Sequence, residues 1–279
     1  MKITLWGTRG SLPSAGPDTV RYGGNTSCVE VRSENRTLLV LDAGTGIRRL
    51  NGTIESDIKR VYVLLTHLHM DHIQGFAFFE PLLRENVQVH VYGPPSTTHD
   101  LRTRLTKYLS PPLFPVRLRD LPAQVTWHDV PLGKFDVDGF QVECDLVTHP
   151  GPTVGYRISE AGSSLVYLPD HEPALGAMRF PVSAQWTSGY DLAANADLLI
   201  HDTQYTLPEY AERAGWGHSA IQHAIAFAKL TKVKRLVTFH YDPGHSDEFI
   251  DGLLREIHSE SRLPFELIPG QEGMTFHLR

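Results

Sequence analysis

The stretch that decides the fold of this chain is Val61-Tyr62-Val63-Leu64-Leu65-Thr66-His67-Leu68-His69-Met70-Asp71-His72. Its first half is a continuous apolar run rich in β-branched residues, which is typical of a buried strand. Its second half places three histidines and one aspartate within six residues. A loop leaving a strand can direct such side chains into one cleft, and imidazole and carboxylate groups suit zinc, manganese or iron. The stretch therefore predicts a metal site, in preference to a solvated loop with incidental histidines.

Three further polar residues, His149, Asp170 and His240, each follow an apolar, strand-like run. Together with the His-x-His-x-Asp-His pattern, they resemble the metallo-β-lactamase fold in sequence order and over nearly the whole chain. The resemblance implies an α/β protein, a four-layer αββα sandwich of two mixed β-sheets flanked by helices. It also implies that residues 1–279 form a single catalytic domain.

The resemblance assigns the seven positions to two divalent metal ions. One ion would be held by His67, His69 and His149, the other by Asp71, His72 and His240, with Asp170 bridging them. Ions roughly 3.5–4 Å apart would share a hydroxide, because metal coordination lowers the pKa of water to about 7. Oxygen-reducing diiron members of the fold carry a glutamate at the position of His69. The histidine here favours a hydrolase with zinc, with manganese or iron as alternatives.

The second half of the chain resembles ribonuclease Z and its phosphodiesterase relatives, in the runs 197–203, 217–220 and 233–240. In that family a histidine before a serine donates a proton to the leaving oxygen, and an acidic residue orients it. The matching residues are His218 and Asp202, although the family usually has glutamate at the latter position. A general acid is useful because an alkoxide is a poor leaving group. Asp71 is expected to be catalytic as well as a metal ligand.

Several residues are candidates for supporting this centre. Asp42 matches the family's aspartate that orients the metal-binding loop. The turn residues Asn25, Thr26 and Ser27 are candidates for contacts with the substrate or with that loop. His171, where a small residue is common, either faces the metals or the substrate or is a satisfied histidine on the surface.

Other segments lead to expectations about local structure. Residues 7–11, Gly-Thr-Arg-Gly-Ser, weakly resemble a phosphate-cradling loop, and a tight turn between strands explains them equally well. Residues 73–83 and 96–109 are expected to be helical, and the proline-rich stretch 110–122 irregular. Residues 172–190 are a candidate lid or substrate wall. A closing helix at about 247–258 is expected to bury Phe249, Leu253 and Ile257.

Bulk properties exclude some classes of protein. A chain of 279 residues with 41% hydrophobic content can bury a large core. The two cysteines, Cys28 and Cys144, make a disulfide framework implausible and favour a reducing compartment. No export signal or membrane span is evident, so we expect a cytoplasmic protein without a membrane partner. A formal charge of −6 disfavours a protein that grips extended nucleic acid.

The tRNA-processing members of the family carry a long arm between the positions that match His149 and Asp170. In this chain the interval is filled by one compact hairpin, 155–158 with 165–168. The missing arm and the acidic balance favour a small anionic phosphodiester, such as a cyclic nucleotide, as the substrate. The expected function is therefore a dinuclear phosphodiesterase that attacks with the metal-bridging hydroxide.

Other functions stay open on the same metal core. A ribonuclease Z-like tRNA 3′-end endonuclease and a lactone or thioester hydrolase are the alternatives among enzymes. A β-lactamase is disfavoured, because the Asp202–His218 pair would have no purpose there. A sensor or binding module with vestigial catalysis is disfavoured by the intact ligand set. Dimers are common in the resembling family, so a homodimer is allowed for.

Overall fold

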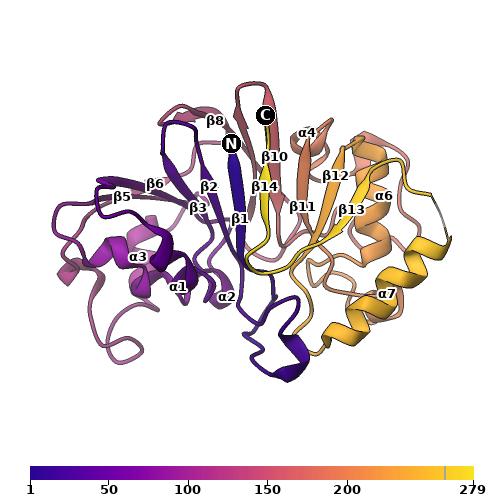
Figure 1. Ribbon diagram of the computed structural model, residues 1–279, viewed down its shortest axis with the longest axis horizontal. Helices are drawn as coiled ribbons and strands as arrows, with labels where there is room; N and C mark the ends of the chain where they lie inside the picture. The colour runs from indigo at the N-terminus through magenta and orange to yellow at the C-terminus, as the bar shows by residue number, and fades with distance from the viewer. Residues whose placement is uncertain (261) are drawn as a thin grey trace.

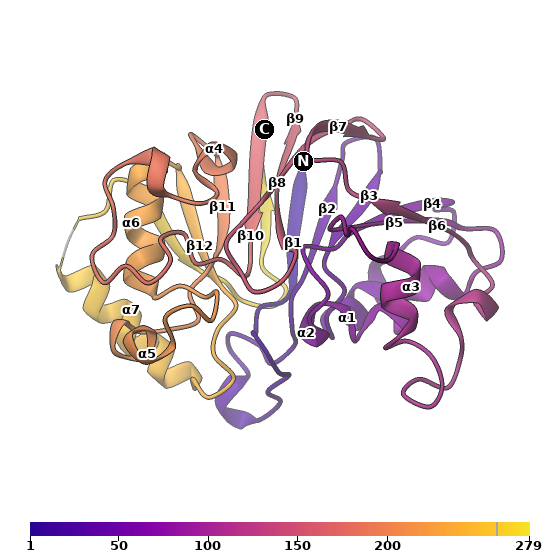
Figure 2. The ribbon, with the colours of Figure 1, turned by 180° about the vertical axis from the view of Figure 1, so that it is seen from behind.

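Two seven-stranded β-sheets lie face to face, and helices cover the outer face of each (Figure 1). The computed structural model describes residues 1–260 and 262–279. This arrangement is the four-layer αββα sandwich of two mixed sheets that the sequence predicted. The first sheet and its helices come from the indigo and magenta part of the chain, with one yellow strand (Thr275–His277) added, and the second sheet and its helices come from the pink, orange and yellow part (Figure 2).

The first sheet has the strand order β14-β1-β2-β3-β4-β5-β6. Strands β14, β1, β2 and β3 pair antiparallel, whereas β3 through β6 are parallel. The strands are β1 (Lys2–Gly7), β2 (Cys28–Arg32), β3 (Leu38–Leu41), β4 (Arg60–Leu64), β5 (Gln88–Gly93), β6 (Gln124–Asp129) and β14 (Thr275–His277).

The second sheet repeats this pattern in the order β13-β12-β11-β10-β9-β8-β7. Strands β7 through β10 are antiparallel and β10 through β13 parallel. The strands are β7 (Gly133–Val137), β8 (Phe140–Leu146), β9 (Val154–Glu160), β10 (Ser163–Leu168), β11 (Leu198–Asp202), β12 (Arg235–Phe239) and β13 (Glu266–Pro269). The hairpin expected between His149 and Asp170 is confirmed as β9 and β10.

The deciding stretch is buried on both faces because β4 lies inside a covered sheet. Tyr62 and Leu64 belong to the core between the two sheets, whereas Val61 and Val63 belong to the core under the first helical layer. Successive strand residues point to opposite faces, so a strand between two apolar layers needs a continuous apolar run.

Short helices form the outer layers. Over the first sheet lie α1 (Ile47–Leu50), α2 (Met70–Ile73) and α3 (Leu101–Thr106), and over the second lie α4 (Tyr190–Ala193), α5 (Leu207–Arg213), α6 (Ile221–Thr231) and α7 (Asp247–Glu260). Short 3₁₀ helices occupy Pro17–Thr19, Asn51–Thr53, Phe76–Phe78, Glu80–Leu83, Leu118–Asp120 and Ala184–Trp186.

Three local expectations were wrong. Residues 73–83 do not form one helix: α2 ends at Ile73, and 3₁₀ helices at Phe76–Phe78 and Glu80–Leu83 follow. The helix expected at 96–109 is confined to Leu101–Thr106. In α7 the buried side chains are Ile250, Leu254 and Ile257, whereas Phe249 is 43% exposed and Leu253 is half-buried.

Two expectations from composition hold in the described residues. Cys28 and Cys144 are buried free thiols, and burial raises the pKa of the Cys144 thiol to about 12. Within residues 1–260 and 262–279, no helix has both the length and the apolar character needed to cross a bilayer.

Candidate metal centre and active site

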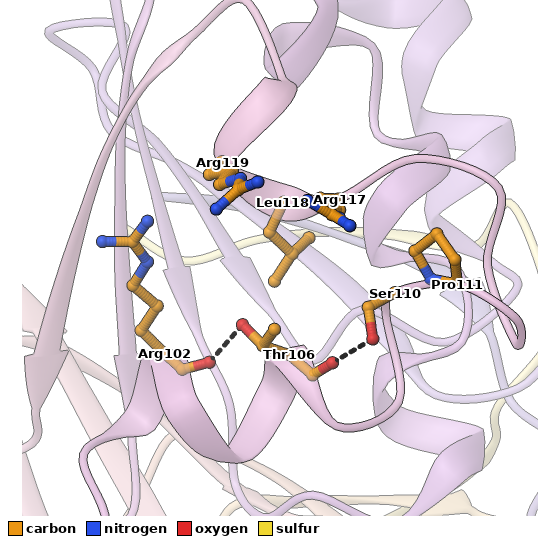
Figure 3. A pocket seen from close by; sticks show the side chains of 7 residues that line it. All are labelled: Arg102, Thr106, Ser110, Pro111, Arg117, Leu118 and Arg119. Atoms are coloured by element: carbon orange, nitrogen blue, oxygen red, sulfur yellow. Dashed lines mark hydrogen bonds between the residues drawn. The ribbon is translucent and has the colours of Figure 1, made fainter.

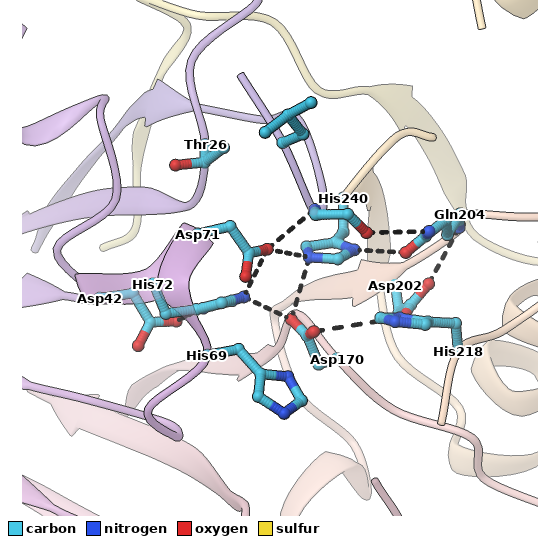
Figure 4. Close-up of polar contacts among 12 residues, drawn as sticks. Thr26, Asp42, His69, Asp71, His72, Asp170, Asp202, Gln204, His218 and His240 are labelled. Carbon is cyan, nitrogen blue, oxygen red and sulfur yellow. Dashed lines mark hydrogen bonds and ion pairs between the residues drawn. The ribbon is translucent and has the colours of Figure 1, made fainter. Parts of the chain in front are cut away.

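The seven predicted ligands come together at one end of the two sheets, from loops that follow strands. The loop after β4 supplies His67, His69, Asp71 and His72. The other three follow β8, β10 and β12. These are His149, Asp170 and His240. Parallel sheets commonly place ligand sites at the carboxyl ends of their strands. Figure 4 shows part of this convergence.

The side chains form two groups that share Asp170. In the first group, His67, His69, His149 and Asp170 each offer an atom within 4.8 Å of the others. His149 Nε2 lies 3.1 Å from His69 Nδ1. Asp170 Oδ2 lies 3.6 Å from His67 Nε2 and 3.7 Å from His149 Nε2.

The second group consists of Asp71, His72, Asp170 and His240. His72 Nε2 lies 2.9 Å from Asp170 Oδ1 and 3.2 Å from Asp71 Oδ2. His240 Nε2 lies 3.2 Å from the same two oxygen atoms. Asp170 is thus placed between the two groups, with one oxygen toward each.

Outer hydrogen bonds fix the tautomers of four histidines. In each case the Nδ1–H can donate to an oxygen atom, which leaves Nε2 free to bind a cation. The acceptors are Thr66 Oγ1 for His67 at 3.1 Å, Asp42 Oδ2 for His72 at 2.8 Å, Gly217 O for His149 at 2.8 Å and Gln204 Oε1 for His240 at 2.9 Å.

Asp42 is fully buried and accepts several of the hydrogen bonds that orient the proposed ligands. Its Oδ1 accepts the Thr66 N–H at 2.8 Å, and its Oδ2 accepts from His72 and, at 3.0 Å, from the Tyr167 hydroxyl. The backbone of Asp42 has φ +56°, a left-handed conformation that aspartate tolerates better than most residues. The structure therefore places Asp42 where it orients both ends of the metal-binding loop.

These residues fit divalent cations because their ring nitrogen and carboxylate oxygen atoms face one another in a buried site. With the hydrogen of a neutral ring on Nδ1, the Nε2 lone pairs of His72 and His240 point at carboxylate oxygens, so that only a second ring proton or a cation can bridge them. In the described part of the chain, His67 Nε2, His72 Nε2 and Asp170 Oδ1 are buried without a hydrogen-bond partner. A cation would relieve this clustering of acceptors, which is otherwise costly in a buried site.

Burial and charge shift the pKa values in two directions. Burial, with the neighbouring histidines, lowers the pKa of His67 well below its ordinary value, and burial lowers that of His149 to about 4. Both are therefore neutral, as a metal ligand must be. For His240, burial lowers the pKa, but Asp170, Asp71 and Asp202 outweigh it and raise the pKa to about 8.

His218 and Asp202 form a hydrogen-bonded pair beside both groups. His218 Nδ1 lies 2.7 Å from Asp202 Oδ2. The imidazole of His218 stacks on that of His240 at 5.1 Å between ring centroids, and meets the ring of His149 edge-on at 5.0 Å. Asp202 is itself held by the backbone N–H groups of Gln204 at 2.9 Å and His171 at 3.2 Å.

Comparison with known proteins identifies the family. A model of the beta-lactamase superfamily domain matches residues 37–241, more than half of the chain. The chain belongs to the β-lactamase superfamily. The Zn²⁺-bound PqqB from Methylobacterium extorquens has the same fold, with a TM-score of 0.72, 19% identity and 100% coverage of both chains.

Two further relatives carry names that refer to RNA processing. The ribonuclease Z of Pyrococcus abyssi is 24% identical, with 100% of both chains covered. The short form of human tRNase Z superposes with a TM-score of 0.68 at 23% identity, again over 100% of both chains. This superfamily member is accordingly a hydrolase of the metallo-β-lactamase type, with a His/Asp cluster suited to divalent metal.

In this β-lactamase superfamily hydrolase, His171 turns away from the metal groups. Its Nδ1 lies 3.0 Å from His201 Nε2, and His201 Nδ1 donates to the Asp202 carbonyl at 2.8 Å. The side chain of His171 thus lies buried among structural partners, and the backbone N–H is what reaches the site, through Asp202. Neither interpretation of His171 is confirmed, because the side chain is buried and not on the surface, and its Nε2 atom has no hydrogen-bond partner among the described residues.

The three turn residues of the superfamily member hold loops and do not line the ligand groups. Asn25 donates from its backbone N–H and side-chain amide to Glu272, and Thr26 exchanges hydrogen bonds of 2.9 Å with Thr45. The carbonyl of Ser27 accepts the N–H of Gly44 at 2.9 Å. Thr26 and Ser27 therefore support the loop that follows Asp42, whereas Asn25 is held by Glu272.

Residues 7–11 form a tight turn, not a phosphate cradle, because their N–H groups are already used. Thr8 and Arg9 donate to the Asn25 carbonyl, and Gly10 donates to that of Tyr241. The Ser11 N–H donates to Asp71 Oδ2 at 2.8 Å. No N–H group of residues 8–11 is left to bind a phosphate oxygen.

Sequence reasoning missed several supporting residues of this hydrolase. Gln204 joins His240 to the Ser11 hydroxyl, and Thr66 joins Asp42 to His67. Glu172, buried beside the site, was considered only as part of the 172–190 loop. For Thr66 and Gln204 a signal existed, since each lies in the polar end of a run that carries a predicted site residue.

Proposed function

We propose that this hydrolase is a metal-dependent phosphodiesterase that acts on a small anionic diester such as a cyclic nucleotide. The observation that carries the proposal is the His218–Asp202 pair, packed against His149 and His240. A proton donor beside a cation site suits the release of an alkoxide, which is the difficult step in cleaving an unactivated diester.

Each metal group has a proposed occupant. His67, His69 and His149 would hold one ion, Asp71, His72 and His240 the other, and Asp170 both, with zinc favoured by the nitrogen-rich ligand set. Bound ions would act as Lewis acids that neutralise phosphoryl oxygens and acidify water.

The side chains of Asp202 and His218 would position the proton donor and supply the proton for the leaving oxygen. Asp202 holds the Nδ1–H of His218, so the ring presents Nε2 for proton transfer and an imidazolium is stabilised. His171 and Gln204 hold the Asp202 carboxylate in place through their backbone N–H groups. The proton therefore moves from His218 Nε2 to the leaving oxygen.

The small size of the substrate is supported by the second sheet. Between His149 and Asp170 the chain forms β9 and β10, joined at Ala161 and Gly162, and the interval contains no protruding arm. A small diester needs no contact beyond the ligand groups and the residues around them.

The test is hydrolysis of 2′,3′- and 3′,5′-cyclic nucleotides by zinc-loaded protein. His218→Ala should lose about 10²–10⁴-fold in rate on these substrates, and much less on bis(p-nitrophenyl) phosphate, whose leaving group needs little protonation. His99→Ala, at an exposed position, is the matched control. Protein that binds two metal ions and cleaves no diester would overturn the proposal in favour of lactones or thioesters.

A second candidate, tRNA 3′-end cleavage, is favoured by two observations. The Pyrococcus relative named ribonuclease Z matches over the full chain. In addition, a cavity of about 400 Å³ beside α3 is lined by Arg102, Arg117 and Arg119 with Thr106 and Ser110 (Figure 3). Such a cluster of guanidinium groups suits a phosphate backbone.

Precursor tRNA separates the two candidates. Under our proposal, low concentrations of enzyme cleave cyclic nucleotides and leave precursor tRNA intact. Efficient tRNA cleavage that is lost in the variant Arg102→Glu/Arg117→Glu/Arg119→Glu, while cyclic-nucleotide turnover is absent or unchanged, would establish the second candidate instead.

A further inference from the structure

A large aromatic side chain stands exposed next to the candidate proton donor. Trp216 is 60% exposed and lies two residues before His218, in the turn Gly215-Trp216-Gly217. The hydrogen bonds described above do not use its indole. A single exposed apolar side chain is common on a protein surface, and what distinguishes Trp216 is its place beside His218.

The turn that carries Trp216 is held in place by hydrogen bonds to one buried carboxylate. Glu172, only 1% exposed, accepts the N–H of Gly215 at 3.1 Å and that of Gly217 at 3.0 Å. The same carboxylate accepts the Tyr210 hydroxyl at 2.7 Å and the Gly176 N–H at 2.9 Å. The backbone on both sides of Trp216 is therefore fixed before any ligand arrives.

The turn also lies directly against the metal centre. The Gly217 carbonyl accepts from His149 Nδ1 at 2.8 Å, and a Cβ atom at Gly217 would lie 2.4 Å from that nitrogen. Gly217 has φ +85°, so glycine is needed here for both space and conformation. Adjacent Cα atoms are about 3.8 Å apart, so the backbone of Trp216 is one residue away from Gly217, which contacts the proposed ligand His149.

We propose that Trp216 is the face on which the base of a nucleotide substrate stacks, and that Glu172 positions it. The inference rests on the proposed function and specifies it: the diester carries a nucleobase. A flat indole on a preformed turn can stack on a base without further ordering, and every base offers a π face. Trp216 would thus determine specificity, while His218 acts on the phosphate end of the same molecule.

The first experiment measures binding without turnover. Zinc-loaded protein is titrated with AMP and with ribose 5-phosphate, which lacks the base, while tryptophan fluorescence and heat of binding are recorded. AMP should quench the wild-type fluorescence, and Trp216→Phe should abolish the quenching while it retains affinity. Trp216→Ala should weaken AMP binding about tenfold or more and leave ribose 5-phosphate binding unchanged. Trp186→Phe, at another exposed tryptophan, should behave as wild type.

The second experiment measures turnover. In Trp216→Ala the KM for 2′,3′-cyclic AMP should rise about tenfold or more, whereas kinetics on glycerol 1,2-cyclic phosphate, a diester without a base, should not change. Glu172→Gln should move the same KM in the same direction, because it loosens the turn.

The outcomes separate this inference from the proposed function. Equal AMP affinity in wild type and Trp216→Ala would overturn the stacking role even if diesters are cleaved. If the protein cleaves no diester but binds AMP through Trp216, the proposed diesterase function is overturned and the inference that Trp216 binds the base is supported. Dissociation of an oligomer in Trp216→Ala, with AMP affinity unaltered, would make the indole an interface between copies and would also overturn the inference.

Discussion

Asp42 shows how a single buried carboxylate can prepare metal ligands. It accepts from Thr66, His72 and Tyr167, and the oxygen atom that meets His72 decides which imidazole nitrogen stays free. Replacement by Asn would remove the charge that favours this tautomer. The general effect of such outer partners on metal affinity is about 10–100-fold.

Asp42→Asn is therefore expected to weaken zinc binding by about 10–100-fold, measured by competition with a chromophoric chelator. Asp57→Asn is the control, because Asp57 forms an exposed pair with Arg36. An affinity that stays at the wild-type value in Asp42→Asn would show that Thr66 and Tyr167 alone orient the loop.

The raised pKa of His240 leads to a pH dependence of metal binding. Because carboxylates raise it to about 8, metal-free protein holds a proton on this side chain below that pH. The proton competes with the metal, so affinity should rise as the pH increases toward 8 and level off above it. Calorimetry in buffers of different ionisation enthalpy should show proton release on binding near neutral pH. Affinity independent of pH from 6.5 to 8 would contradict this.

The residues that sequence could predict are those that end a recognisable run. His67 to His72, His149, Asp170 and His240 follow strand-like stretches, and the structure brings all seven together. Their roles as ligands stay a prediction. Gln204 also lies at the polar end of a run, but its partner, like that of Ser11, could not be predicted, since His240 and Asp71 are distant in the chain and close only in the folded state.

At the scale of elements, local backbone features explain why the helix predicted for residues 73–83 does not form. A helix across residues 73–83 would have to continue through Gly75 and Pro81. The N–H of Gly75 instead donates to the Ala43 carbonyl at 2.9 Å, and Pro81 has no N–H to donate. Ile73, Phe76 and Leu82 of this segment are nevertheless buried.

Gly75→Ala should destabilise the fold by about 1–3 kcal/mol. A Cβ atom there would lie 2.1 Å from the Gly44 carbonyl oxygen and 2.7 Å from Ile47, so the metal loop and the loop after β3 must separate. Urea denaturation followed by circular dichroism measures the change. Gly52→Ala, where an added Cβ meets nothing within 4 Å, is the control and should leave the midpoint nearly unchanged.

The closing helix forms where it was predicted, but two of the three side chains predicted to be buried are not. Its apolar residues Phe249, Ile250, Leu253, Leu254 and Ile257 allow two neighbouring stripes on a helix. The structure buries the stripe with Ile250, Leu254 and Ile257 and leaves Phe249 against His245, with ring centroids 4.2 Å apart. Periodicity alone cannot choose between stripes that differ by one residue; the shape of the surface beneath decides.

At the scale of the whole molecule, the candidate metal centre joins the two sheets. One set of ligands follows β4 of the first sheet, and the other follows β8, β10 and β12 of the second. Bound ions would therefore link the halves of the sandwich. The fold class was predictable because the strands that precede the seven proposed ligands each carry an apolar run, and this prediction is confirmed.

Removal of metal should therefore lower the thermal stability of the entire protein. Ligand at a hundred times its Kd contributes about 2.7 kcal/mol, which corresponds to a drop in Tm of about 5–10 °C for a chain of this size. Differential scanning calorimetry with and without chelator checks this, and added zinc should restore the Tm. His67→Ala should respond much less to the chelator; equal responses would show that the effect does not arise at this centre.

The pairing of β14 with β1 has a consequence for the order of folding. Lys2, Ile3 and Thr4 meet His277, Phe276 and Thr275, so β1 finds one of its neighbours only after synthesis has passed residue 275. A nascent chain that has reached His240 already holds every proposed ligand while one edge of β1 is unpaired. Contacts this distant in sequence slow folding and leave a strand edge open to other chains. Early metal capture would hold the loops after β4, β8, β10 and β12 together before β14 closes that edge.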